Sequence, residues 1–317
     1  MHDFGDPSSS LFCAVLVAVG FAAGLIGSLL GLGSGWLIVP ALNIMGISAV
    51  MSVGTSLATM LITTTFAVVQ YARRGMLAMR LGLAFGIPAL VGVQAGRTLL
   101  AWLDRIAIAD TFLRTTYIVL LLGMGVAMGR DSRTMALPTT APQPSAWPVW
   151  GPVLKVDNVS LPWYQAIVSG MVAGLLSGIL GIGGGLILVP LMTMVFHLPV
   201  LTAVATSLVS VLIASLHGTL LYAFAGHVVG SAIPCLACGS VIGSSVGVAL
   251  SRFADERVLK RLFAALTLLT AASMLAREVK WPLVSRTILF GGTTLGVVTI
   301  LVQLLGSWRR AKQRGDS

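Results

Sequence analysis

The sequence carries the same interrupted stretch twice, as GLIGSLLGLGSGWLIVP at residues 24–40 and as GLLSGILGIGGGLILVP at residues 174–190. In each copy an apolar helical pattern stops at a run of alternating glycines and then resumes. Each glycine costs a helix about 1 kcal/mol relative to alanine, so three within five positions make a continuous helix improbable. A helix break repeated in both halves of an apolar chain is the sequence feature that best indicates a transporter's binding site.

The composition predicts an all-α, polytopic membrane protein. Of the 317 residues, 56% are hydrophobic and only 9% are charged, and the mean hydropathy is +0.96. Soluble domains are less apolar and far more charged. Apolar runs of about 18 residues or more, the length that a helix needs to cross a bilayer, alternate with short charged clusters. The continuous apolar pattern excludes a transmembrane barrel, whose strands alternate in polarity.

The net charge of +10 does not indicate nucleic-acid binding. Lysine and arginine occur in short clusters between apolar segments, as in the cytoplasmic loops of membrane proteins. The expected partners are a small anionic substrate and the lipid bilayer, with no nucleic acid, and the sequence leaves a homo-oligomer open. Cys13, Cys235 and Cys238 have no metal or disulfide framework in their spacing, and we predict them to be small buried hydrophobes.

The apolar segments predict two repeats in one chain. The predicted order is an N-terminal tail at 1–10, a first transmembrane repeat at 11–129, a proline-rich linker at 130–163, a second repeat at 164–276, an extra C-terminal transmembrane helix at 277–306 and a basic cytoplasmic tail at 307–317. Each repeat starts with a glycine-broken helix pair and continues with three spans. The second piece of the first pair, residues 36–47, is only about 18 Å long as a helix, against a core of about 30 Å. The shortness of this piece favours a re-entrant or broken hairpin for the glycine-broken pair, with two full spans as the alternative.

Charged loops predict that the two repeats insert in opposite orientations. After its third segment the first repeat has a strongly basic loop, whereas the corresponding loop of the second repeat has only a histidine. In the next loop the second repeat is strongly basic, whereas the first repeat has balanced charges. The residues concerned are Arg73, Arg74 and Arg80 against His227, and then Asp104, Arg105 and Asp110 against Arg252, Arg257, Lys260 and Arg261. By the positive-inside rule, the N-terminus is expected outside and the C-terminus in the cytoplasm.

The two copies also share finer motifs, and these carry a family resemblance. Thr55-Ser56-Leu57 matches Thr206-Ser207-Leu208, and each is followed by a Y-x-x-x-G loop, at Tyr71 and Tyr222. Over residues 15–128 and 165–276 the chain resembles the sulfite exporter TauE/SafE family. The resemblance implies a multi-pass bacterial inner-membrane transporter of sulfite, organosulfonates, thiosulfate or related sulfur anions. Ser34 stands where the second copy has Gly184, so the substrate could differ.

The glycine breaks are the first candidates for substrate binding. The helix pieces that begin near residues 36 and 186 expose unpaired backbone N–H groups and the positive end of a helix dipole, which together favour an anion. An oxyanion could then approach the backbone closely; alternatively, the glycines only permit tight helix crossing. The candidates are Gly33, Ser34, Gly35, Gly183, Gly184 and Gly185.

Polar residues on the neighbouring spans are the second group of candidates. Their hydroxyl groups either face the pore, where they replace the water around an anion, or form hydrogen bonds within their own helix or to neighbouring helices. The residues are Thr55, Ser56, Thr206 and Ser207. Arg97 either pairs with the substrate or extends to the interface. His217 carries a coupled proton or is a neutral structural histidine. All ten carboxylates are expected in loops or tails, which disfavours a cation pump.

These observations predict a secondary transporter with alternating access around a midplane anion site between two opposed breaks. No nucleotide-binding motif, metal site or cofactor is expected. An anion channel of the same fold is one alternative. An intramembrane serine enzyme using Ser34 and His217 is another, but Leu32 breaks the required G-x-S-G spacing and the second copy has no hydroxyl at the matching position. We therefore predict that the protein is not an enzyme. The sequence leaves the anion, the direction and the coupling ion open.

Overall fold

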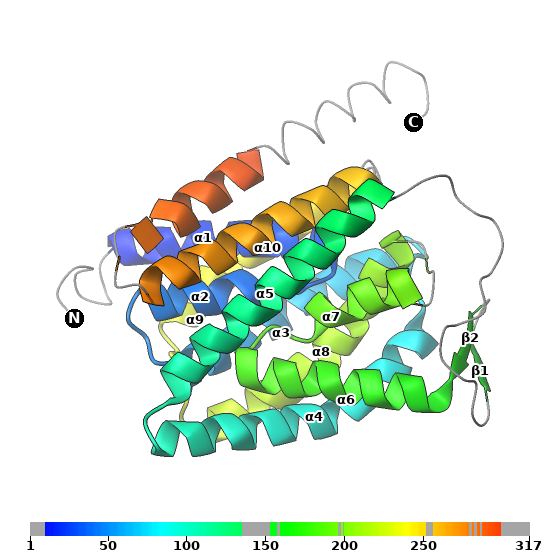
Figure 1. Cartoon of the computed structure of the whole chain (residues 1–317), viewed down its shortest axis with the longest axis horizontal. Helices are drawn as coiled ribbons and strands as arrows, with labels where there is room; N and C mark the ends of the chain where they lie inside the picture. Colours follow the sequence, from blue (N-terminus) through cyan, green and yellow to red (C-terminus); the bar gives the residue numbers. More distant parts are fainter. Residues whose placement is uncertain are drawn as a thin grey trace.

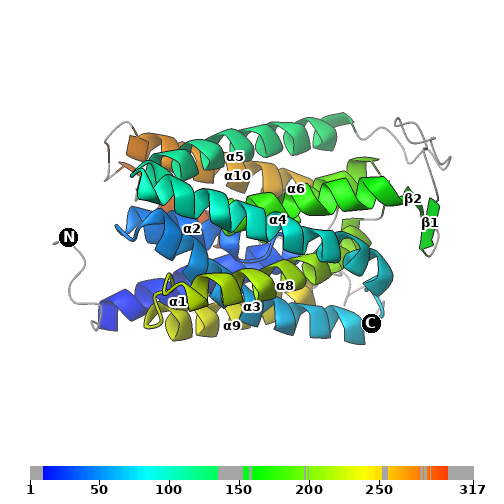
Figure 2. The same cartoon turned by 90° about the horizontal axis from the view of Figure 1, so that it is seen from below.

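The computed structural model describes residues 10–134, 153–156, 159–195, 198, 200–251, 256–278, 281, 284–285 and 287–298, and most of these are helical. The helices are α1 Ser10–Leu30, α2 Gly35–Ile44, α3 Ala49–Arg73, α4 Met79–Arg105, α5 Ala109–Thr134, α6 Trp163–Leu180, α7 Gly185–Pro190 continued by the π-helix η1 Leu191–Val195, α8 Val200–Phe224, α9 Ala232–Ser251 and α10 Glu256–Glu278. The long helices lie roughly along one common direction and form a bundle (Figures 1 and 2).

The apolar helices confirm a polytopic membrane protein. Seven of the described helices are long and apolar enough to cross a bilayer, namely α1, α3, α4, α5, α6, α8 and α9. A further apolar helix at Thr287–Val298 lies within the predicted C-terminal span, and residues 299–317 lie outside the described residues. In the predicted linker, α5 continues to Thr134, and the short strands β1 Val153–Val156 and β2 Val159–Pro162 pair in antiparallel fashion. This hairpin is an exception to the all-α prediction.

Glycines interlock the two halves of the chain. A Cβ atom added at Gly24 of α1 would overlap the carbonyl group of Ser240 on α9, and one at Gly174 of α6 would overlap that of Ala89 on α4. Small residues allow membrane helices to approach until their backbones touch, which maximises van der Waals contact in lipid. The first helix of each half therefore packs against a later helix of the other half.

One end of the bundle, which we call the Cys13 end, contains the start of α1. A disulfide joins Cys13 to Cys235 at the start of α9, with the two Cα atoms 5.6 Å apart. The backbone N–H of Val229, just before α9, donates to the hydroxyl of Thr55 near the start of α3, at 2.9 Å. The starts of α1, α3 and α9 therefore lie at the same end.

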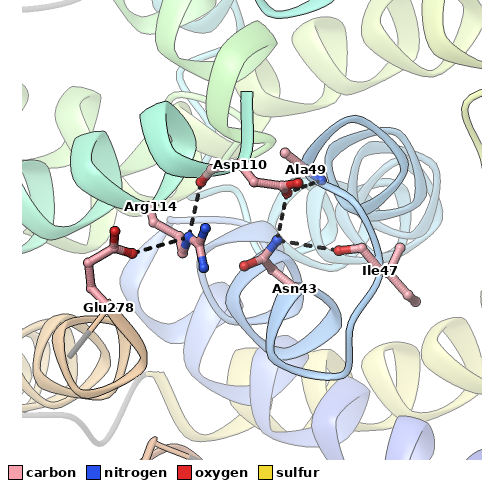
Figure 3. Close-up of polar contacts among 6 residues, drawn as sticks. All are labelled: Asn43, Ile47, Ala49, Asp110, Arg114 and Glu278. Atoms are coloured by element: carbon pink, nitrogen blue, oxygen red, sulfur yellow. Dashed lines mark hydrogen bonds and ion pairs between the residues drawn. The ribbon is translucent and has the colours of Figure 1, made fainter. Parts of the chain in front are cut away.

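The end of α2 also lies at the Cys13 end. The carboxylate of Asp110, in the first turn of α5, accepts hydrogen bonds from the backbone N–H of Ala49 at 2.8 Å and from the amide of Asn43 at 3.2 Å (Figure 3). These two residues flank the connection from α2 to α3. The start of α1 and the end of α2 thus lie at the same end of the bundle.

At the opposite end, which we call the Arg74 end, the second broken pair behaves in the same way. Leu81 and Ala166, near the starts of α4 and α6, share one apolar cluster with Met192 in η1 and Ala203 at the start of α8. The guanidinium group of Arg74 donates to the backbone carbonyl of Val248 near the end of α9. The pair formed by α6 and α7–η1 therefore begins and ends at the Arg74 end.

The prediction that all three cysteines are small buried hydrophobes is wrong. Cys13 and Cys235 form the disulfide, and Cys238 is an exposed free thiol. The bonded pair is 222 residues apart in sequence, and only the packing of α1 on α9 brings the two thiols together. Spacing along the chain carries no signal of that packing.

The two glycine runs differ at one position in backbone conformation. Gly184 has φ +80°, in the left-handed region, whereas its counterpart Ser34 has φ −81°. A side chain in the left-handed region brings its Cβ close to the following carbonyl oxygen. At this one position, glycine is therefore required in the second run and not in the first.

The disulfide predicts the thiol count of the native protein. Without reductant, denatured protein should take up one maleimide, at Cys238, and after reduction it should take up three, as measured by intact mass. Cys238→Ser should take up none without reductant. Three maleimides without reductant would contradict the bond between Cys13 and Cys235.

The conformational difference predicts unequal substitutions. Gly184→Ser should lower the free energy of unfolding by about 1–2 kcal/mol, because a Cβ there is strained; it would also lie 2.9 Å from the carbonyl oxygen of Ala173. Ser34→Gly should change it by only a few tenths of a kcal/mol. Thermal unfolding in detergent measures both, and equal shifts would argue against the conformational difference.

Candidate functional site

The two glycine runs cross with their backbones in direct contact. A Cβ atom added at Gly35 would overlap the carbonyl oxygen of Gly181, and one added at Gly185 would overlap that of Gly31. Glycine at both positions is therefore a steric requirement of the crossing. The breaks lie next to each other inside the bundle.

The hydroxyls of Ser56 and Ser207 hold this crossing from the two sides. Ser56 on α3 donates to the carbonyl oxygen of Gly181 at 3.0 Å. The hydroxyl of Ser207 on α8 lies 2.8 Å from the carbonyl oxygen of Gly31 and equally close to that of Val204 on its own helix, so it can donate to either. Each hydroxyl thus lies within hydrogen-bond distance of the break of the opposite half. Both side chains are fully buried.

The outer faces of the runs are apolar. A Cβ added at Gly33 would lie 2.6 Å from the sulfur of Met60 and 3.1 Å from a methyl group of Val211, and one at Gly183 would meet the same two side chains. Met60 and Val211 are fully buried. Gly33 and Gly183 therefore face a methionine and a valine.

Hydrogen-bond donors accumulate at the start of α2. Ser34 and Trp36 are fully buried, and neither the hydroxyl of Ser34 nor the indole N–H of Trp36 has a hydrogen-bond partner among the described residues. Within this described part of the chain, the backbone N–H groups of Ser34, Gly35 and Trp36 donate no hydrogen bond either. Buried polar groups are normally paired, so this local excess of donors needs an acceptor.

The second break does not repeat this set of donors. Gly184 and Leu186 occupy the positions of Ser34 and Trp36, so the second half has neither the hydroxyl nor the indole N–H. The helix after it, α7, has only six residues before η1 begins. The backbone crossing is common to both halves, but the donor set belongs to the first.

The other predicted hydroxyls are differently engaged. Thr55 donates to the carbonyl of Met51 at 2.7 Å and accepts from Val229. The hydroxyl of Thr206 is buried and has no partner among the described residues. Thr55 therefore has a structural hydrogen bond at the Cys13 end, and Thr206 retains a free donor on α8.

Arg97, on α4, lies beside the residue of α6 that precedes the second break by one turn. Its backbone packs against Gly178 of α6, and the carbonyl of Gly178 accepts a hydrogen bond from Tyr222 at 2.6 Å. The Nε atom of Arg97 is buried and has no partner among the described residues. His217 on α8 is half-buried, with Phe66 at the matching position of the first half. The roles assigned to Arg97 and His217 stay predictions.

Sequence reasoning missed Tyr117, which touches both breaks. Its fully buried hydroxyl donates to the carbonyl of Leu180, the last residue of α6, at 2.7 Å. It also lies 3.5 Å from the carbonyl oxygen of Gly35, the first residue of α2. No repeat signal marked this residue, because it belongs neither to the glycine runs nor to the Thr-Ser-Leu and Tyr-x-x-x-Gly motifs that the two halves share.

Sequence reasoning also missed a polar cluster that anchors α5 (Figure 3). Besides the contacts of Asp110 with α2 and α3, the Nε atom of Arg114 donates to the backbone carbonyl of Asp110 at 3.2 Å and lies 3.4 Å from a carboxylate oxygen of Glu278 on α10. Asp110 and Glu278 were expected in loops, but they lie in terminal turns of α5 and α10. This cluster fixes α5 to three other helices at the Cys13 end.

Comparisons with known proteins agree with this architecture. The model of the family described as "Sulfite exporter TauE/SafE" matches residues 16–274. "Probable membrane transporter protein YunE" of Bacillus subtilis is 27% identical over 254 residues, which are 75% of this chain and 88% of that protein. "Probable membrane transporter protein MJ0441" of Methanocaldococcus jannaschii is 26% identical over 219 residues, 67% of this chain and 73% of that protein. No solved structure matches the chain. The chain belongs to the sulfite exporter TauE/SafE family.

Proposed function

We propose that this membrane transporter moves small sulfur-containing anions of the sulfite, organosulfonate or thiosulfate class by alternating access. The family and the names of the relatives support a membrane transporter. The sulfur-anion class rests on the family description, and the preference for an anion rests on the site.

The excess of donors at the start of α2 carries the proposal. An unpaired hydroxyl, an unpaired indole N–H and unpaired backbone amides offer protons to a ligand that only accepts them. The start of a helix adds the positive end of its dipole. No carboxylate of the described residues lies at the crossing, which fits an anion better than a cation. Ser34 and Trp36 are the proposed centre of the site.

The remaining predicted site residues then support this centre. Ser56 and Ser207 hold the crossing, while Gly35 and Gly185 allow it to be tight. Thr206 and Arg97 keep unpaired donors on α8 and α4. They are proposed as secondary contacts that an anion meets when the crossing opens.

We also propose that the halves are inverted repeats in a cell inner membrane. In support, the α1–α2 pair opens at the Cys13 end and the pair of α6 and α7–η1 opens at the Arg74 end. Disulfides form in oxidising compartments, which favours the outside for the Cys13 end. Arg73, Arg74 and Arg80 then lie on the cytoplasmic side, as the positive-inside rule requires.

The function is tested with purified protein in proteoliposomes. Uptake of ³⁵S-labelled sulfite, thiosulfate and taurine should be saturable for at least one of them and should exceed uptake of sulfate, which serves as the comparison. Protein-free liposomes are the control. A linear, non-saturating flux would indicate a channel, and no flux of any of these anions under any imposed ion gradient would refute the proposal.

The indole donor is tested by Trp36→Phe. This change keeps an aromatic ring but removes the N–H, so the KM for the transported anion should rise about three- to tenfold, the effect of one lost hydrogen bond. The maximal rate should change less. Trp102→Phe, at an exposed position on α4, is the matched control. An unchanged KM for Trp36→Phe would remove Trp36 from the site.

A further inference from the structure

The hydroxyl of Tyr117 stands where the two breaks meet and has two acceptors for one proton. The carbonyl of Leu180 precedes the second break, and Gly35 follows the first. The distances are 2.7 Å and 3.5 Å, so the proton is donated to Leu180. The carbonyl of Gly35 is the nearby second acceptor.

The helix that carries Tyr117 is anchored to the helix that follows the first break, because Asp110 of α5 accepts a hydrogen bond from Asn43 of α2. Asp110, Arg114 and Tyr117 are spaced by four and three residues, so they share one face of α5. The carboxylate of Asp110 accepts hydrogen bonds from Asn43 on α2 and Ala49 on α3, and Arg114 forms an ion pair with Glu278 on α10. A shift of the second break relative to the first therefore moves the carbonyl of Leu180 away from Tyr117, while the carbonyl of Gly35, on the anchored α2, stays nearby.

The other buried tyrosines lack this arrangement. Tyr71 donates to the carbonyl of Ser28 on α1 at 3.0 Å, and Tyr222 donates to that of Gly178 on α6 at 2.6 Å. Both acceptors lie about one turn before a break, and these two tyrosines correspond between the halves. Tyr117 alone of these three tyrosines has acceptors beside both breaks.

We propose that Tyr117 is the positioning residue that holds the two breaks in their closed crossing. Opening the crossing transfers its hydrogen bond from the carbonyl of Leu180 to that of Gly35; the proton remains on the phenol. The element is two-state because a hydroxyl has one proton to donate. The inference shares one assumption with the proposed function, namely that the crossing opens during transport.

The test measures opening without any substrate. Ser34 is fully buried, so a thiol there reacts only when the crossing opens. The parent protein is Ser34→Cys with Cys238→Ser, purified in detergent without reductant, so that Cys13 and Cys235 stay bonded. The readout is the rate at which N-ethylmaleimide modifies the introduced cysteine, measured by intact mass.

The test compares three side chains at position 117: phenylalanine can donate no hydrogen bond, tyrosine can donate one, and 4-aminophenylalanine can donate two. Tyr117→Phe should raise the labelling rate about three- to tenfold, because the closed state loses a hydrogen bond. 4-Aminophenylalanine at position 117 can donate to both carbonyls and should lower the rate below that of the parent. Tyr71→Phe, the matched control, should change it less than about twofold.

Labelling of Tyr117→Phe at the rate of the Tyr71→Phe control would overturn the proposal, and so would two position-117 variants that shift the rate in the same direction. If Tyr117→Phe does not fold, the 4-aminophenylalanine variant decides alone: a rate equal to or above that of the parent refutes the switch. Because no anion is present, failure here leaves the transport assays untouched. The absence of transport would likewise leave this result standing.

Discussion

The backbone contact between the two glycine runs is the constraint on which the rest of the structure depends. Gly35 lies against the carbonyl of Gly181, and Gly185 lies against that of Gly31, without room for a methyl group. Two helices can be broken at one depth in a membrane only if their freed carbonyls find donors. Ser56, Ser207 and Tyr117 supply these donors from α3, α8 and α5. The long helices around the breaks thus provide the hydrogen-bond donors that the broken helices leave missing.

The scaffold is close to symmetric, but the polar groups on it are not. The glycines that pack α1 on α9 have counterparts that pack α6 on α4, and Ser56 corresponds to Ser207. In contrast, the unpaired donors of Ser34 and Trp36 occur only in the first half. The tyrosine that reaches both breaks, Tyr117, also belongs to the first half. The matching glycine runs of the two halves form the crossing, and the side chains that differ between the halves carry the proposed chemistry.

Much of the architecture could be predicted from the sequence, because apolar length and glycine spacing are local signals. The breaks at residues 31–35 and 181–185 and most spans follow directly from them. The disulfide, the exchange of helices between halves and the role of Tyr117 could not be predicted, because each depends on which segments become neighbours in space. Asp110 shows the same limit: next to a loop in sequence, it is a hydrogen-bond acceptor for two other elements in the fold. The roles of the predicted substrate residues stay proposals.

The packing of α1 against α9 has a consequence for biosynthesis. α1 ends at Leu30, whereas its partner begins at Ala232, so the ribosome must add about 200 residues before the contact can form. At roughly 5–20 residues per second, α1 waits for about 10–40 s in the membrane. During that time Gly20 and Gly24 lack the α9 backbone on which they pack, and Cys13 lacks Cys235. Formation of the disulfide therefore reports that α1 and α9, which are made far apart in time, have come together.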